Sequence, residues 1–73
     1  MKKKEITIGE VIVKLNGKPF VIGVDTFSSE DWFEGYYDTE EEAIRFAENT
    51  GGEMLKKHAY SKDGKWIGEG GTN

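Results

Sequence analysis

The 73-residue sequence contains no cysteine, one proline and a single histidine, His58. Without cysteine there is no disulfide framework and no thiolate chemistry, and one histidine cannot supply a zinc site. No nucleophile lies near His58 in the sequence, so we interpret this histidine as a strand surface residue. These absences favour a protein that is not an enzyme and that uses no metal and no cofactor.

Long hydrophobic runs are also missing. No apolar stretch approaches the roughly 18 residues of a membrane span, and the lysines at positions 2–4 are not followed by the apolar part of a secretory signal. We therefore expect a cytoplasmic protein that does not contact membranes. Hydrophobic residues at 36% and charged residues at 33% fit one soluble globular domain over residues 1–73.

The net charge of −4 conceals an uneven distribution. From Asp25 to Glu53 the chain carries ten acidic residues against one basic residue, Arg45, for a local charge of −9. Lysines gather towards the two ends of the chain. The acidic part should repel nucleic acid and attract basic protein surfaces.

The N-terminal half has the composition of strands. Residues 5–15 are dense in β-branched side chains, and a bulge at Gly9–Glu10 would return both sets of apolar residues to one face. The sequence NGKP at 16–19 predicts a turn, so residues 20–27 are expected to form a hairpin with the first strand. Residues 32–38 form a plausible third strand, with a short helical turn as the alternative.

Residues 39–50 carry the signals of an amphipathic helix. Thr39 and Glu42 have the spacing of a capping box, and three consecutive glutamates lie in the first turn, where the helix dipole favours them. Apolar residues from Ala43 to Ala47 form the buried stripe. Gly51–Gly52 predicts a left-handed C-cap.

The remaining residues predict two more strands and a tail. Residues 53–61 and 65–69 read as strands joined by a tight turn at Asp63–Gly64, and residues 69–73 as a frayed tail. The expected fold is therefore α+β, a small antiparallel sheet of four to five strands with one helix packed on one face. The other face of such a sheet should expose an aromatic pair, either Trp32 with Tyr36 or Phe33 with Tyr37.

The acidic and aromatic residues together suggest a surface for a protein partner, because exposed aromatics rimmed by charge are common in interfaces. Cross-strand aromatic pairs that stabilise the sheet, and a solvated helix face, are the alternatives. The candidate partner-binding residues are Glu30, Asp31, Trp32, Glu34, Tyr36, Asp38, Glu40, Glu41 and Glu48.

A nucleic-acid-binding module is the second hypothesis. The last two strands form a basic hairpin with one aromatic side chain, a combination that single-strand binders use. A pI of 4.9 opposes this hypothesis, and lysines that protect a strand edge are the structural alternative. The residues concerned are Lys56, Lys57, Lys62, Lys65 and Trp66.

Residues 16–60 resemble a known family. The shared features are KPF opening a strand, SSE and then FE after it, YDTEEEAIRFAE as an acid-started helix, and a glycine break before a strand with Lys56 and Lys57. They resemble the short inhibitor of host RNA polymerase made by bacteriophages that carry their own single-subunit polymerase. This chain adds a long first strand and a terminal hairpin.

The resemblance implies a small sheet with one helix that places an acidic strip on the polymerase without catalysis. By position, it implies that Lys56 or Lys57 would be an auxiliary contact. The strip would comprise Glu34, Asp38, Glu40, Glu41 and Glu48. The hypothesis is thus a phage or mobile-element accessory protein that inhibits a larger, basic-surfaced host protein, such as RNA polymerase or a defence nuclease.

Overall fold

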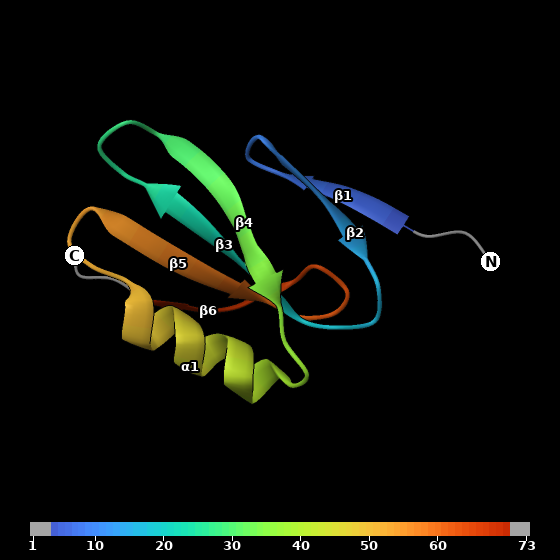
Figure 1. The fold of residues 1–73 in the computed structure, drawn as a ribbon. Helices are drawn as coiled ribbons and strands as arrows, with labels where there is room; N and C mark the ends of the chain where they lie inside the picture. Colours follow the sequence, from blue (N-terminus) through green and yellow to red (C-terminus); the bar gives the residue numbers. More distant parts are fainter. Residues whose placement is uncertain (1–3, 71–73) are drawn as a thin grey trace.

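The structure is a computed structural model and describes residues 4–70. Four antiparallel strands form the main sheet in the order β4-β3-β5-β6, and the first two strands form a separate hairpin (Figure 1). The single helix packs on β5 and β6. The expected α+β fold with one helix on the sheet is confirmed. The elements are β1 (Lys4–Ile8), β2 (Val11–Leu15), β3 (Phe20–Asp25), β4 (Glu30–Tyr36), α1 (Glu40–Thr50), β5 (Leu55–Tyr60) and β6 (Trp66–Gly70).

The helix lies close to the sheet because small side chains separate them. Ala43 and Ala47 of α1 are fully buried against Val21 of β3 and Ala59 of β5. Larger side chains, among them Ile44 and Phe46, close the sides of this cluster. The apolar stripe predicted for residues 39–50 is therefore the surface that α1 buries.

The start of α1 follows the prediction, but its end does not. Thr39 is the N-cap, and its hydroxyl accepts a hydrogen bond from the Glu42 amide at 3.1 Å. The predicted left-handed cap is wrong, because Gly51 is extended, with φ −76° and ψ 156°. The Thr50 hydroxyl instead donates to the Phe46 carbonyl at 2.7 Å. The extended glycine leads the chain directly towards β5.

The predicted bulge at Gly9–Glu10 is also wrong, because these residues form the turn of the β1–β2 hairpin. Ile8 pairs with Val11 across it, and Gly9 has φ +61°, as a two-residue hairpin turn requires. Residues 20–27 therefore do not form a hairpin with the first strand. The NGKP linker carries the chain out of the hairpin and into the main sheet.

The hairpin covers the sheet face opposite the helix. Val13 of β2 packs against Phe20 and Ile22 of β3, and all three are at most 2% exposed. The expected uncovered face is therefore largely buried. Phe33 and Tyr36 reach its edge, where both lie about one third exposed and contact the Phe20 ring.

Strand β4 confirms the third strand but changes which aromatics share a face. Val21 pairs with Gly35 and Ile22 pairs with Phe33, so Glu34 is an extra residue in a β-bulge. A bulge reverses the alternation of side chains along the strand. For this reason Tyr36 lies on the hairpin side with Phe33, and Tyr37 lies on the helix side. Neither of the two expected pairs, Trp32 with Tyr36 or Phe33 with Tyr37, shares a face.

The C-terminal hairpin is confirmed, but its last strand ends one residue later than expected. Asp63 and Gly64 lie in the turn, and the buried Ser61 hydroxyl accepts hydrogen bonds from the Asp63 and Lys65 amides. Strand β6 extends to Gly70, whereas the tail was expected from residue 69. The rest of that tail, residues 71–73, lies outside the described residues.

Candidate functional site

The outer side of α1 and its flanking residues form an acidic surface, which we call the acidic helix layer. Arg45 is the one basic residue in this segment, residues 38–53. Every acidic residue of the segment is exposed. These residues are Asp38, Glu40, Glu41, Glu42, Glu48 and Glu53.

Two carboxylates of this layer have nearby cations. Asp38 lies 3.3 Å from the Lys18 ammonium, and Glu41 lies 3.3 Å from the Arg45 guanidinium. All four side chains are more than half exposed, and such pairs contribute little to stability. The layer therefore keeps a strong negative field at neutral pH.

Glu34 and Lys57, which the sequence assigned to two different surfaces, are bonded to each other. The Lys57 ammonium lies 2.7 Å from the Glu34 carboxylate, and these side chains are 11% and 17% exposed. The Trp32 indole N–H donates to the same carboxylate oxygen. The ammonium also lies over the rings of Trp32 and Phe46. Glu34 thus offers no open carboxylate to a partner, and Lys57 no open ammonium.

The environment of Glu34 changes its pKa. Burial raises the pKa of this carboxyl, but the hydrogen bonds from Lys57 and Trp32 and the charge of Lys57 outweigh that effect. The net result is a pKa below the usual value of a glutamate. Glu34 is therefore ionised at neutral pH and paired with a cation.

We expect Glu34 to make the fold sensitive to acid. Because its pKa is lower in the folded chain, its stabilisation is fully present above the ordinary glutamate pKa. It is lost as the pH falls through the lower, folded-state pKa. We therefore measure the free energy of unfolding with urea at a series of pH values. As the pH is lowered, this free energy should fall more steeply for the unaltered protein than for Glu34→Gln. Equal slopes would mean that the ion pair does not contribute to acid sensitivity.

The other predicted residues of β4 lie apart from the acidic helix layer. Glu30 is exposed at the start of the strand, opposite Asp25. Asp31 is half-buried, with its carboxylate against Gly9 of the β1–β2 turn. The Tyr36 hydroxyl donates to the Lys14 carbonyl at 2.6 Å. Asp31 and Tyr36 therefore join the sheet to the hairpin, and cross-strand packing accounts for much of the aromatic content of β4.

Only some of the residues predicted to bind nucleic acid are exposed together on the C-terminal hairpin. Lys62 and Lys65 are exposed beside the turn, and Trp66 is 62% exposed. Its ring centroid lies 6.1 Å from that of His58. Lys56 is half-buried, and Lys57 faces the helix side in the ion pair described above. The structure thus separates Lys57 from the surface around Trp66.

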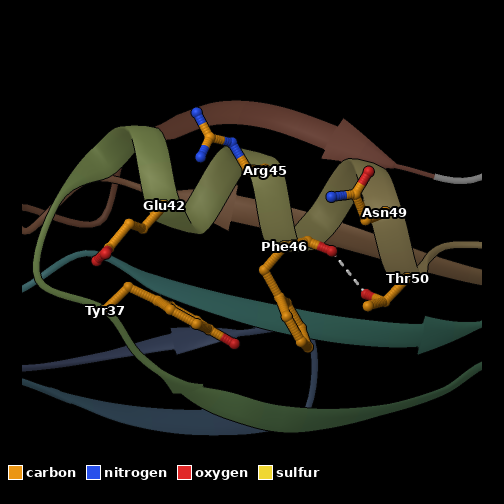
Figure 2. A pocket seen from close by; sticks show the side chains of 6 residues that line it. All are labelled: Tyr37, Glu42, Arg45, Phe46, Asn49 and Thr50. Atoms are coloured by element: carbon orange, nitrogen blue, oxygen red, sulfur yellow. Dashed lines mark hydrogen bonds between the residues drawn. The ribbon is translucent and has the colours of Figure 1, made fainter.

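A groove beside α1 brings together residues that the sequence did not mark as a site (Figure 2). It has a volume of about 450 Å³. The rings of Tyr37 and Phe46 lie side by side along it, with centroids 5.2 Å apart. Burial and the negative charge of Glu34 raise the pKa of Tyr37, so this phenol is neutral at physiological pH. The lining residues are Tyr37, Glu42, Arg45, Phe46, Asn49 and Thr50.

Only the helical spacing of Glu42, Phe46 and Asn49 could have indicated this groove. These residues lie four and three positions apart and therefore share one side of a helix. Tyr37 joins them because the bulge in β4 reverses the alternation of side chains, so that its ring lies on the helix side of the sheet.

Over residues 4–70, no helix is long and apolar enough to cross a membrane. The same residues contain no group of three histidine or acidic side chains that could hold a metal ion. Comparison of the chain with known protein families, with curated proteins and with solved structures found no match.

Proposed function

We propose that this chain is a non-catalytic binding protein whose acidic helix layer occupies a basic surface on a larger protein. The observation that carries the proposal is the gathering of six exposed carboxylates on one short segment that holds a single arginine. Like charges held this close repel one another, and a basic partner relieves that repulsion. The same field would speed association by electrostatic steering.

A nucleic-acid-handling protein is the class of partner that we propose. Such proteins carry basic surfaces because they bind phosphate backbones. The resemblance of residues 16–60 to the phage inhibitors of host RNA polymerase supports the same choice. The protein would then act as a phage or mobile-element accessory protein, with RNA polymerase as the first target to test and a defence nuclease as the second.

Reversing charge on the helix should remove binding while the fold survives. Tagged protein should retain a protein complex from nuclease-treated bacterial lysate and release it at high salt. The double variant Glu41→Lys/Glu48→Lys should bind at least about tenfold more weakly, because two attractions become repulsions. Purified bacterial RNA polymerase, measured by biolayer interferometry, tests the first target directly. Circular dichroism checks the fold.

A matched control separates the site from the net charge. Glu10 and Asp63 are exposed residues of the two hairpin turns and do not belong to the acidic helix layer. The variant Glu10→Lys/Asp63→Lys changes the net charge by the same amount and should bind normally. Equal weakening of both double variants would contradict the proposal. Retention of nucleic acid alone, from untreated lysate, would transfer the binding function to the surface around Trp66.

A further inference from the structure

We propose that the groove beside α1 binds the side chain of an arginine that a protein partner presents. The inference rests on the proposed function, since it names the residue that a basic partner would place against the acidic helix layer. The shape of the groove, its aromatic surface and its charge favour this class of ligand.

The shape of the groove fits a side chain better than an enclosed small molecule. Its volume of about 450 Å³ falls within the usual range of ligand pockets. However, four of its six lining residues are exposed, so it is open to solvent along the helix. The exposed four are Glu42, Arg45, Asn49 and Thr50. An open trough cannot surround a metabolite, but it can receive a side chain that a partner already holds in place.

The two rings supply a surface on which a guanidinium can stack. Tyr37 and Phe46 are tilted by 33° and lie side by side beneath the helix (Figure 2). Phe46 already accepts a cation from the sheet side, where the Lys57 ammonium lies 5.4 Å from its ring centroid. A planar guanidinium stacks on aromatic faces, whereas an ammonium is a compact and strongly hydrated charge. This favours arginine over lysine.

The charges around the groove leave one carboxylate without a partner. Lys57 is paired with Glu34, and Arg45 is paired with Glu41. Glu42 makes no ion pair within residues 4–70, and Figure 2 shows its carboxylate on the side of Tyr37. A guanidinium that stacks on the rings could therefore form a charge-assisted hydrogen bond with Glu42. The side-chain carbonyl of Asn49 provides a further acceptor on the rim.

A peptide titration tests this assignment without knowledge of the natural partner. The probe is acetyl-Gly-Arg-Gly-amide, added to ¹⁵N-labelled protein and followed by two-dimensional NMR. Saturable shifts are expected at the amides of Tyr37, Glu42, Phe46 and Asn49. Glu42→Gln should weaken binding at least about fivefold, because it removes the charged acceptor. The matched control is Glu48→Gln, which removes the same charge from an exposed helix position outside the groove, and it should change affinity little.

Two further measurements test whether the groove prefers a positively charged ligand. Arg45→Gln should strengthen binding of the arginine peptide, because it removes a positive charge beside the groove that repels the guanidinium. The same peptide with lysine in place of arginine should bind more weakly than the arginine peptide. The same peptide with glutamate in that position should not bind. Equal losses in Glu42→Gln and Glu48→Gln would overturn the assignment, as would tighter binding of the glutamate peptide.

The two proposals can fail separately. If the arginine peptide leaves the groove unchanged while charge reversal at Glu41 and Glu48 still abolishes partner binding, only the groove assignment is wrong. If the peptide binds as expected but the reversal leaves partner binding intact, the acidic helix layer is not the partner surface.

Discussion

Replacing Lys57 by methionine should lower the free energy of unfolding by about 3 kcal/mol. The substitution keeps most of the side-chain volume but leaves the Glu34 carboxylate, which is only 17% exposed, without its cation. An uncompensated charge in such a place is costly, whereas a surface pair would lose less than about 1 kcal/mol. For a chain of this length the total stability is on the order of 4–11 kcal/mol. The loss should therefore be plain in urea unfolding at neutral pH.

A double-mutant cycle separates the ion pair from general packing. In Glu34→Leu/Lys57→Met both charges are gone, so most of the stability lost in Lys57→Met should return. A coupling energy of at least about 1 kcal/mol is expected between the two positions. If Lys57→Met costs less than that, or if the second substitution restores nothing, the pair does not stabilise the fold.

The helix could be predicted from the sequence because its signals are local. The spacing of Thr39 and Glu42 and the position of the apolar stripe lie within a few turns of one another, and both are found in α1. The C-terminal signal was misleading. Two glycines permit a left-handed cap but do not require one, and the path towards β5 decided the conformation of Gly51.

The β1–β2 hairpin and the bulge at Glu34 in β4 depend on packing between segments that are distant in the sequence. A bulge at Gly9–Glu10 and a turn there both place Ile6, Ile8 and Val13 on one side, so the local pattern fits either. Only the burial of Val13 against Phe20 and Ile22 selects the turn. The bulge at Glu34 likewise follows from the pairing of β4 with β3, which the alternation of residues 32–38 does not encode.

In the candidate site, too, the local features could be predicted from the sequence and the contacts between distant segments could not. The exposed carboxylates of α1 follow from the helix itself, and their charge could be counted in the sequence. Glu34 could not be separated from them, because its partner, Lys57, lies 23 residues away on a strand that is not adjacent to β4. Strand β3 lies between the two, so the ion pair must cross it.

The ion pair between Glu34 and Lys57 crosses β3 at Gly23. It pairs with Trp32 on one side and with Lys57 on the other, and it is buried. A Cβ atom at this position would lie 2.4 Å from the Trp32 indole. The missing side chain is therefore what lets the indole lie against the strand and reach Glu34.

Gly23→Ala should accordingly destabilise the protein by about 2 kcal/mol, although alanine is normally preferred to glycine inside a strand by roughly 0.5–1 kcal/mol. The added methyl group must displace the rigid indole, which would lose its hydrogen bond to Glu34 and its contact with Lys57. Urea unfolding measures the loss, and a red shift in tryptophan emission should accompany it.

Two control variants test whether the loss of stability in Gly23→Ala comes from displacement of the Trp32 indole. Gly52→Ala introduces a Cβ with no atom within 4 Å and should leave stability nearly unchanged. In a Trp32→Leu background, Gly23→Ala should cost little, because a smaller side chain can make room for the methyl group. If Gly23→Ala remains as costly in that background, the strand itself and not the indole requires glycine. The Glu34–Lys57 pair would then owe its position to the backbone of β3 alone.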